Sequence, residues 1–209
     1  MIALGPVFTV GHMTSPVKLF TLFTDKKLFH IFGEKCFLSE NKYIKLMAKT
    51  ICKNPETRFI CLDVIQLIAG FDQTHLNVSR LPVYLTHCPA GTSTRNMDHF
   101  AQNFRTKTCS KFDFGSKEEN ELHYHQPFPP QYNVTQMDVP VALYSGGKDS
   151  LADPQDVKIL AKQLKNLVLH KCIEEWAHLE FIWGIDEILK DFRSIQFLCE
   201  KEHKLPNHI

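Results

Sequence analysis

The stretch from Val139 to Gly184, VPVALYSGGKDSLADPQDVKILAKQLKNLVLHKCIEEWAHLEFIWG, decides the fold. It begins with a short apolar run, Val139–Tyr144, which two glycines stop, and this pattern predicts a buried strand entering a tight turn. Asp153-Pro154 then predicts an N-cap with proline at the first helical position, and apolar residues at helical spacing carry the helix to about Asn166. Leu167–Ile173 predicts a second buried strand. The stretch therefore forms a strand, loop, helix, strand unit.

The loops that follow the two strands carry an acid and a base. Asp149 lies on the first loop, and His178 follows the second strand. Parallel strands place both loops at the same edge of a sheet, so the two side chains can meet there. A plain turn aspartate and a structural histidine are the alternative interpretation of the same residues.

A second alternative is nucleotide chemistry. Residues 145–150, SGGKDS, resemble the SGGxDS pyrophosphate loop of ATP pyrophosphatases. Such a loop needs free backbone N–H groups and a helix N-terminus aimed at the phosphates. The predicted helix starts later, at Asp153-Pro154, and only 59 residues follow Ser150, which is short for the rest of a nucleotide-binding domain. We rank this interpretation third.

Taken together, two motifs resemble those of the acid lipase family, the gastric and lysosomal lipases and their relatives. Residues 146–153, GGKDSLAD, resemble the GGxDxLAD segment around that family's catalytic aspartate. Residues 178–184, HLEFIWG, resemble its HLDFIWG-like segment around the catalytic histidine, with Glu180 in place of the usual aspartate. The resemblance implies that Asp149 orients the imidazole, while His178 acts as general base and then general acid.

The resemblance also implies a fold and a reaction. It implies an α/β class fold, the C-terminal half of an α/β-hydrolase with an inserted, mostly helical lipase cap. Residues 1–13 would be a core strand, 14–136 the cap, and 137–209 the core part that carries the acid and the histidine. The implied activity is hydrolysis of neutral lipid esters, acylglycerols or steryl esters, through an acyl-serine and without a cofactor.

Within this organisation the sequence predicts several further elements. Ile2–Val10 is expected to be a buried strand, similar to the family's ALAPV strand. Ser39 is expected to cap a helix containing Ile44, Met47 and Ile51. Phe59–Ile68 is apolar on nearly all sides, as expected for a helix packed within the protein. Thr92-Ser93 is expected to cap a helix that runs through Phe104.

Cysteine usage leaves two possibilities open. The chain has seven cysteines, an odd number, in no zinc-binding pattern. The sequence alone favours reduced, buried cysteines. The resemblance implies instead a disulfide between Cys52 and Cys61, because similarly spaced cysteines are paired in the family's cap. Two N-glycosylation sequons, at Asn77 and Asn133, agree with a secreted or lysosomal relative.

Composition excludes several classes of protein. The formal net charge of +1 gives no electrostatic basis for binding nucleic acid. No apolar run approaches the ~20 residues needed to span a bilayer, and Met1–Leu4 lacks the features of a signal peptide. His123-Tyr124-His125 lies near Asp113 in sequence, but no further ligand set accompanies it, so we expect no metal site.

One motif is missing. No Gly-x-Ser-x-Gly occurs in the chain, although this elbow presents the nucleophile of α/β-hydrolases. Residues 91–95, GTSTR, lack its second glycine. We therefore expect the serine to lie outside this chain, before Met1, and the chain alone to be inactive. The alternative is a catalytically dead remnant that binds lipid or a partner. Expected partners are neutral lipid esters or a lipid interface, and the missing half or a second copy of the chain.

Overall fold

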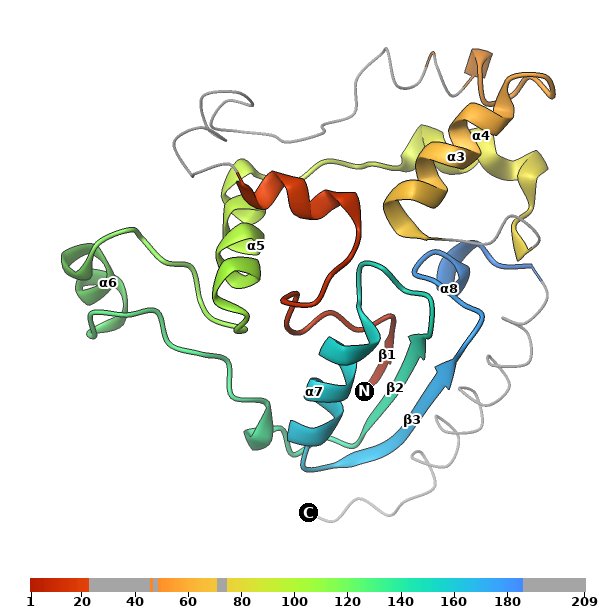
Figure 1. The fold of residues 1–209 in the computed structure, drawn as a ribbon. Coiled ribbons are helices and arrows are strands. Elements are labelled where there is room, and N and C mark those ends of the chain that lie inside the picture. Colours follow the sequence, from red (N-terminus) through yellow and green to blue (C-terminus); the bar gives the residue numbers. More distant parts are fainter. Residues whose placement is uncertain (23–45, 47–48, 71–74, 186–209) are drawn as a thin grey trace.

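A three-stranded parallel sheet forms the centre of the computed structural model, which describes residues 1–22, 46, 49–70 and 75–185. The strand order is β1 (Ile2–Leu4), β2 (Val141–Gly146) and β3 (Leu167–Ile173), with β2 in the middle. The helix α7 (Pro154–Gln163) connects β2 to β3, as a parallel pair requires. Figure 1 shows the sheet with α7 beside it, α3, α4 and α8 beyond the upper end of the strands, and α5 and α6 off to the left.

The strands differ from the sequence predictions in length and burial. β3 has the predicted bounds, and β2 starts and ends two residues later than predicted. β1 stops at Leu4 instead of reaching Val10, because Gly5 takes a left-handed conformation with φ 54° and Pro6 follows it. All six residues of β2 are buried, as expected.

The prediction that the outer two strands are also buried was wrong. β1 and β3 are each paired on one side only, with β2. Leu4 on β1 is 39% exposed and Val168 on β3 is 56% exposed. An apolar run marks a strand but does not show whether a neighbouring strand covers it.

Two apolar clusters sandwich the sheet. On one face Val141 and Leu143 pack against α7, through Val157 and Leu160. On the other face Ala142 and Tyr144 pack with residues that follow β3, Trp176 and Phe181. Alternate residues of β2 thus serve opposite faces, as the period of a strand requires.

The predicted start of α7 is confirmed. The Asp153 side chain accepts a hydrogen bond from the Gln155 N–H, and Pro154 occupies the first turn. The cap predicted at Ser93 is confirmed in the same way, because its side chain accepts from the Asn96 N–H at the start of α5 (Thr94–Thr106). Both helix starts therefore follow from local sequence.

In the sequence, most of the remaining helical elements fall between β1 and β2. Figure 1 shows α6 farthest from the sheet, and α3 and α4 near α8. Their bounds are η1 (Pro16–Leu22), α3 (Arg58–Ala69), η3 (Val78–Arg80), α4 (Leu81–His87), α6 (Lys117–Tyr124), η4 (Val134–Gln136) and α8 (Glu180–Trp183). The helix expected from Ser39 lies mostly outside the described residues. No described helix combines the length and the apolarity that crossing a membrane requires.

The prediction that the helix at Phe59–Ile68 is packed within the protein was wrong. The helix exists, as α3, but only Cys61, Leu62 and Ala69 on it are buried. Ile65 is partly buried, and the other apolar side chains are exposed, among them Phe59 at 55% and Leu67 at 65%. An exposed apolar face of this kind is unusual on a soluble protein and marks a surface suited to apolar contact.

Candidate active site

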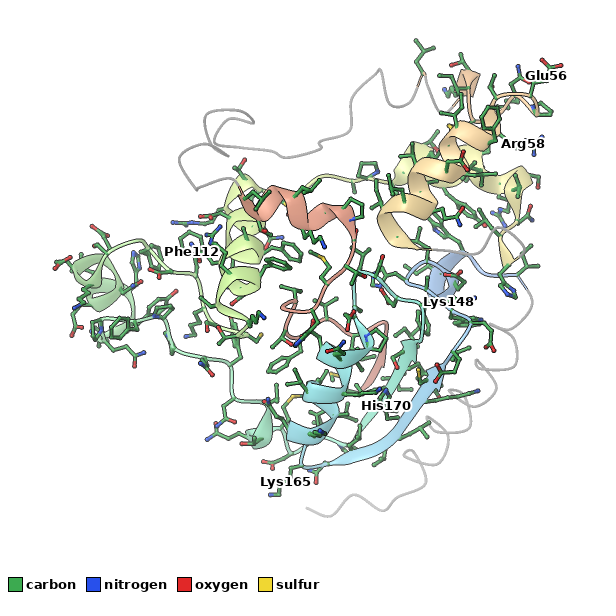
Figure 2. All side chains as sticks on the ribbon, in the orientation of Figure 1. Glu56, Arg58, Phe112, Lys148, Lys165 and His170 are labelled. Atoms are coloured by element: carbon green, nitrogen blue, oxygen red, sulfur yellow. A yellow bond between two sulfur atoms is a disulfide. The ribbon has the colours of Figure 1, made fainter. Side chains whose placement is uncertain are left out.

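The carboxyl ends of the three strands meet at one edge of the sheet, and the acid and the base meet there too. Asp149 lies on the loop after β2, and His178 on the loop after β3. The Nδ1 atom of His178 lies 2.9 Å from Oδ2 of Asp149. In Figure 2, Lys148 marks this edge, and Lys165 marks the opposite edge. The pairing expected from the parallel topology is therefore present.

Backbone hydrogen bonds fix Asp149 in place independently of its contact with the histidine. The residue is 2% exposed. Its Oδ1 atom accepts hydrogen bonds from the N–H groups of Leu151, at 2.9 Å, and Ala152, at 2.8 Å. Its Oδ2 atom remains for the imidazole. An ionised carboxylate can only accept, so the proton of this contact lies on Nδ1 of His178. The Nε2 atom of the neutral ring is then free to accept a proton.

His178 contacts Asp149, Ala69 and Gly5, which hold it from three sides. Its backbone N–H points at the Ala69 carbonyl at the end of α3, at an N···O distance of 3.5 Å. Gly5, just after β1, approaches the ring so closely that a Cβ atom there would lie 3.2 Å from Nδ1. The side chain is 26% exposed, so the ring is accessible on its remaining side. This combination of an oriented and accessible imidazole suits a general base.

Glu180 supports the same loop. It is 3% exposed, and its Oε2 atom accepts a hydrogen bond of 3.2 Å from the Ala177 N–H, next to His178. The glutamate that departs from the expected motif thus still binds the backbone of the histidine loop.

The loop after β2 does not have the features of a phosphate site. The N–H groups of Gly147, Lys148 and Asp149 donate to the carbonyls of Ile173, Trp176 and Gly146. A Cβ atom on Gly146 would lie 2.4 Å from the Trp176 carbonyl oxygen, so the glycine allows close packing of the two loops. A pyrophosphate loop needs free amides, and the structure therefore argues against the nucleotide interpretation.

A cavity of 390 Å³ opens beside His178. One wall comes from the segment after β1, and its lining residues are Val7, Phe8, Val10, Met13 and Val17. The opposite wall comes from α5 and contributes Asn96, Met97, His99, Phe100 and Asn103. Leu151 and His178 complete the lining. No sequence pattern predicts this cavity, because its two walls are distant in the chain.

The polar groups of the α5 wall are occupied by other parts of the protein. Asn103 and His99 both bind the backbone of Ser110, and the Asn96 side chain donates to the Thr92 hydroxyl. Aliphatic, aromatic and thioether side chains supply most of the remaining lining. The cavity therefore suits an apolar chain better than a polar ligand.

The two cysteines that the resemblance paired form a disulfide. Cys52 and Cys61 are bonded, with their Cα atoms 5.7 Å apart. Both are buried in a cluster with Leu62, Leu76 and Leu81. The bridge ties the start of α3 to the turn that precedes it.

Both sequons begin short 3-10 turns. Asn77 and Asn133 each accept a hydrogen bond from the hydroxyl of the third sequon residue, Ser79 and Thr135 respectively. Asn133 is exposed and Asn77 is partly exposed.

The His123-Tyr124-His125 segment makes structural contacts. The His123 ring stacks on Phe114, with ring centroids 3.6 Å apart, and the Tyr124 hydroxyl donates to the Phe112 carbonyl. Among the described residues, no group of three or more His, Cys, Asp or Glu side chains is placed to hold a metal ion.

A second buried carboxylate anchors one wall of the cavity. Asp156, in the first turn of α7, is 2% exposed and accepts from the Thr9 hydroxyl, at 2.6 Å, and from the His12 N–H, at 2.9 Å. Its Oδ1 atom also lies 2.9 Å from Nδ1 of His12. Sequence reasoning missed this cluster, and an acidic residue in a first helical turn is too common a signal to reveal it.

Comparison with known proteins gives close relatives over part of their length. The chain is 42% identical over 199 residues to human lysosomal acid lipase/cholesteryl ester hydrolase, covering 95% of this chain and 50% of that protein. It is 40% identical over 199 residues to the rat protein of the same name. It is 40% identical over 202 residues to human gastric triacylglycerol lipase, covering 97% and 51% of the two chains. The chain thus spans about half the length of the curated relatives it matches.

Solved structures give weaker likenesses. An α/β-hydrolase enzyme from a deep-sea metagenome library has a TM-score of 0.38 at 16% identity, covering 100% of this chain and 58% of that one. An α/β-hydrolase fold protein from Nakamurella multipartita has a TM-score of 0.40 at 15% identity, covering 93% and 58%. A scan against models of protein families finds no match.

The fold and the sequence comparison agree on the class. The parallel sheet with its crossover helix is an α/β fold, and the sequence matches lipases along nearly the whole of this chain. The chain is therefore a homologue of the acid lipases, a partial α/β-hydrolase that corresponds to about half of its lysosomal and gastric relatives.

Proposed function

We propose that Asp149 and His178 are the acid and the base of a carboxylic ester hydrolase that acts on neutral lipid esters. The observation that carries the proposal is the 2.9 Å contact between Asp149 Oδ2 and His178 Nδ1, on a histidine that also lines an apolar cavity. Asp149 would hold the tautomer with Nε2 free, and His178 would take the proton of a serine and return it to the leaving alcohol.

The serine of this triad would come from a segment outside these 209 residues. The chain contains no Gly-x-Ser-x-Gly, and the order of the triad in α/β-hydrolases is serine, acid, histidine. The chain alone would then lack the nucleophile and its oxyanion hole. The partner that completes the site would be a segment with that motif. The alternative partner is a second copy of this chain, which would bind in place of that segment.

The relatives support the substrate class and the compartment. Their names describe a cholesteryl ester hydrolase and a triacylglycerol lipase, so we propose acylglycerols or steryl esters as substrates. We propose a secreted or lysosomal location on the same basis. We further propose that residues 14–136 act as a cap between core parts 1–13 and 137–209, and that the exposed apolar side chains of α3 face lipid.

The test supplies the missing nucleophile. The half of human lysosomal acid lipase that this chain does not match would be fused ahead of Met1. Hydrolysis of a fluorogenic acyl ester and of a cholesteryl ester would then be measured. We expect hydrolysis that His178→Gln removes and that Leu122→Gln, a change at an exposed residue on α6, leaves intact. A fusion with a cooperative unfolding transition but no hydrolysis would contradict the proposal.

The unfused chain provides a second measurement. A serine-directed fluorophosphonate should not label it, because no serine lies on a nucleophile elbow. Stoichiometric labelling together with ester hydrolysis would show that the nucleophile lies within the 209 residues.

The second candidate is lipid binding without catalysis. It is favoured by the absence of the nucleophile motif in a chain that retains the apolar cavity. It predicts an inactive fusion that still binds lipid.

A further inference from the structure

We infer that Ser15 is a positioning residue for the Asp149–His178 pair, because it ties the loop of the acid to the end of α3 that contacts the histidine. The inference deepens the proposed function, on which its kinetic consequence rests. Ser15 is 1% exposed and directly precedes Pro16, at the start of η1. It acts on the pair through two backbone groups, one on the side of the acid and one on the side of the base.

The first link leads to the acid. The Ser150 carbonyl accepts two hydrogen bonds, from the Thr14 N–H at 3.1 Å and from the Ser15 N–H at 3.0 Å. The N–H of the same peptide group belongs to Leu151, and it donates to Oδ1 of Asp149 at 2.9 Å. Hydrogen bonds at the two ends of one peptide group polarise and strengthen each other. The backbone at Ser15 thus orients the peptide group that holds the Asp149 carboxylate.

The second link leads to the base. The Ser15 hydroxyl donates to the Ile68 carbonyl at 2.6 Å. Ile68 lies in the last turn of α3, and the last carbonyls of a helix need partners from outside it. The next carbonyl, that of Ala69, faces the His178 N–H at an N···O distance of 3.5 Å. Because the two carbonyls are adjacent in the chain, the hydroxyl that holds the first determines where the second lies relative to the histidine loop.

The Ser15 hydroxyl is used both as a donor and as an acceptor. It donates to Ile68 and accepts from the Val17 N–H at 3.3 Å, where η1 begins. A hydroxyl carries one proton and two lone pairs, so it can make both bonds at once, whereas the methyl group of alanine can make neither. At 1% exposure the side chain is closed off from the solvent that could replace these bonds. Loss of the hydroxyl therefore releases the end of α3 from the loop of the acid.

The backbone around Ser15 is held independently of the hydroxyl. Earlier in the same segment, the Thr9 hydroxyl and the His12 N–H bind the Asp156 carboxylate on α7, at 2.6 Å and 2.9 Å. The bond from Ser15 to the Ser150 carbonyl comes from a backbone N–H, which alanine also has. Removal of the hydroxyl alone therefore cuts the link to the base and leaves the link to the acid in place.

The test compares Ser15→Ala with Ser116→Ala in the 209-residue chain by NMR. Ser116 caps α6, and its side chain accepts from the Glu119 N–H, so its change also removes a serine hydroxyl at the start of a helix. We expect Ser15→Ala to shift the His178 ring signals and to speed exchange of the Nδ1 proton with water on the order of tenfold. Ser116→Ala should change neither. Equal changes in the two variants, or unchanged His178 signals in folded Ser15→Ala, would overturn the inference.

Ser15→Cys covers the case in which Ser15→Ala does not fold. A thiol is only slightly larger than the hydroxyl and is a weaker donor, so the His178 signals should change in the same direction and by less. Thr14→Ala is the control at the neighbouring position, because Thr14 is exposed and its N–H bonds the same Ser150 carbonyl. If Ser15→Cys changed the signals no more than Thr14→Ala, the hydroxyl would not act on the histidine.

The fusion described above supplies the kinetic measurement. A displaced base slows the chemical step more than it weakens substrate binding, so Ser15→Ala should lower kcat on the order of tenfold with KM nearly unchanged. General loss of stability would instead reduce the amount of active enzyme. Titration of the active serine with a fluorophosphonate corrects for that loss, because kcat is then calculated per active site.

Failure of this inference is distinguishable from failure of the proposed function. A fusion that hydrolyses esters at the same rate with and without Ser15→Ala would refute the positioning role alone. His178 signals that respond to Ser15→Ala in the unfused chain, with a folded but inactive fusion, would support the link from Ser15 to the histidine and refute the hydrolase.

Discussion

Gly5 lies against His178, so that a Cβ atom on Gly5 would lie 3.2 Å from Nδ1 and 3.3 Å from Cε1 of the ring. These residues come from loops after different strands, β1 and β3, and they meet because both strands end at the same edge of the sheet. The absence of a side chain at Gly5 therefore determines how closely this segment approaches the imidazole.

Gly5→Ala should strain the backbone and displace the histidine. The φ of 54° at Gly5 is unfavourable for alanine by about 1–2 kcal/mol. The new methyl group also presses on the ring that Asp149 holds. We expect a loss of about that much unfolding free energy in urea, together with a shift of the His178 ring signals in NMR spectra.

The matched control is Gly115→Ala. Gly115 also has a positive φ, 88°, but a Cβ atom there would meet nothing within 4 Å. This variant should lose stability without moving the His178 signals. If both variants moved these signals equally, the contact at Gly5 would not be the cause.

Asp149→Asn should release the tautomer of His178. The asparagine oxygen can still accept from Leu151 and Ala152, but its NH₂ group then faces Nδ1 and favours the proton on Nε2. The NMR signal of a hydrogen-bonded Nδ1 proton should disappear. In the active fusion, turnover should fall by about 10⁴-fold, as for the same change in serine hydrolases.

Asp153→Asn is the control for this prediction. Asp153 caps α7 three residues before Asp156, and asparagine caps helices as well as aspartate does. The Nδ1 proton signal and the turnover should both survive this change. Loss of the signal in both variants would indicate general loosening of the loop.

Removal of the disulfide should destabilise the start of α3. The Cys52–Cys61 bridge closes a loop with a sequence separation of 9. A loop of this size is worth about 2–3 kcal/mol of unfolding free energy. The double variant Cys52→Ala/Cys61→Ala should lose this amount in urea, and Cys88→Ala, at an exposed free cysteine, should lose little. Equal losses would show that the bridge contributes nothing in particular.

Acidification should destabilise the protein through His170. This residue on β3 lies 2.9 Å from the Ser145 hydroxyl through Nε2, and burial, with a smaller contribution from Lys158, lowers its pKa below the ordinary value of 6.5. The unfolded chain therefore takes up a proton that the folded chain resists. This contribution to stability is present above about pH 6.5 and is lost as the pH falls below it.

Urea unfolding between pH 7 and pH 5 measures this effect. His170→Asn should reduce the fall in unfolding free energy over that range. His125→Asn is the control, because His125 is exposed and its φ of 56° is one that asparagine tolerates. An unchanged pH dependence in His170→Asn would show that other groups cause the fall.

Local signals carried most of what the sequence could predict. Asp153-Pro154 and Ser93 marked helix starts because a cap is a contact between neighbours in the chain. Leu167–Ile173 was recognisable as a strand from its own run of apolar residues, which is again a local pattern. The meeting of Asp149 and His178 followed from parallel topology, which a strand, helix, strand order dictates.

The features that the sequence did not predict share a cause, because each depends on residues that are distant in the chain. The apolar pattern of α3 could not show that only Cys61, Leu62 and Ala69 would be covered. The contact between His12 and Asp156 joins residues 144 positions apart, and no spacing rule reveals it. The cavity beside His178 likewise requires the fold before its walls can be paired.

The bond between the Ala69 carbonyl and the His178 N–H makes α3 a mechanical partner of the histidine. The same part of the chain is joined to the end of the histidine loop a second time, through the bridge between Leu76 and Gly184 and the stacked rings of Tyr84 and Trp183. A displacement of α3 or α4 would therefore either carry the histidine loop along or break these attachments. The position of His178 is therefore tied to that of α3 and α4, two helices that lie outside the sheet.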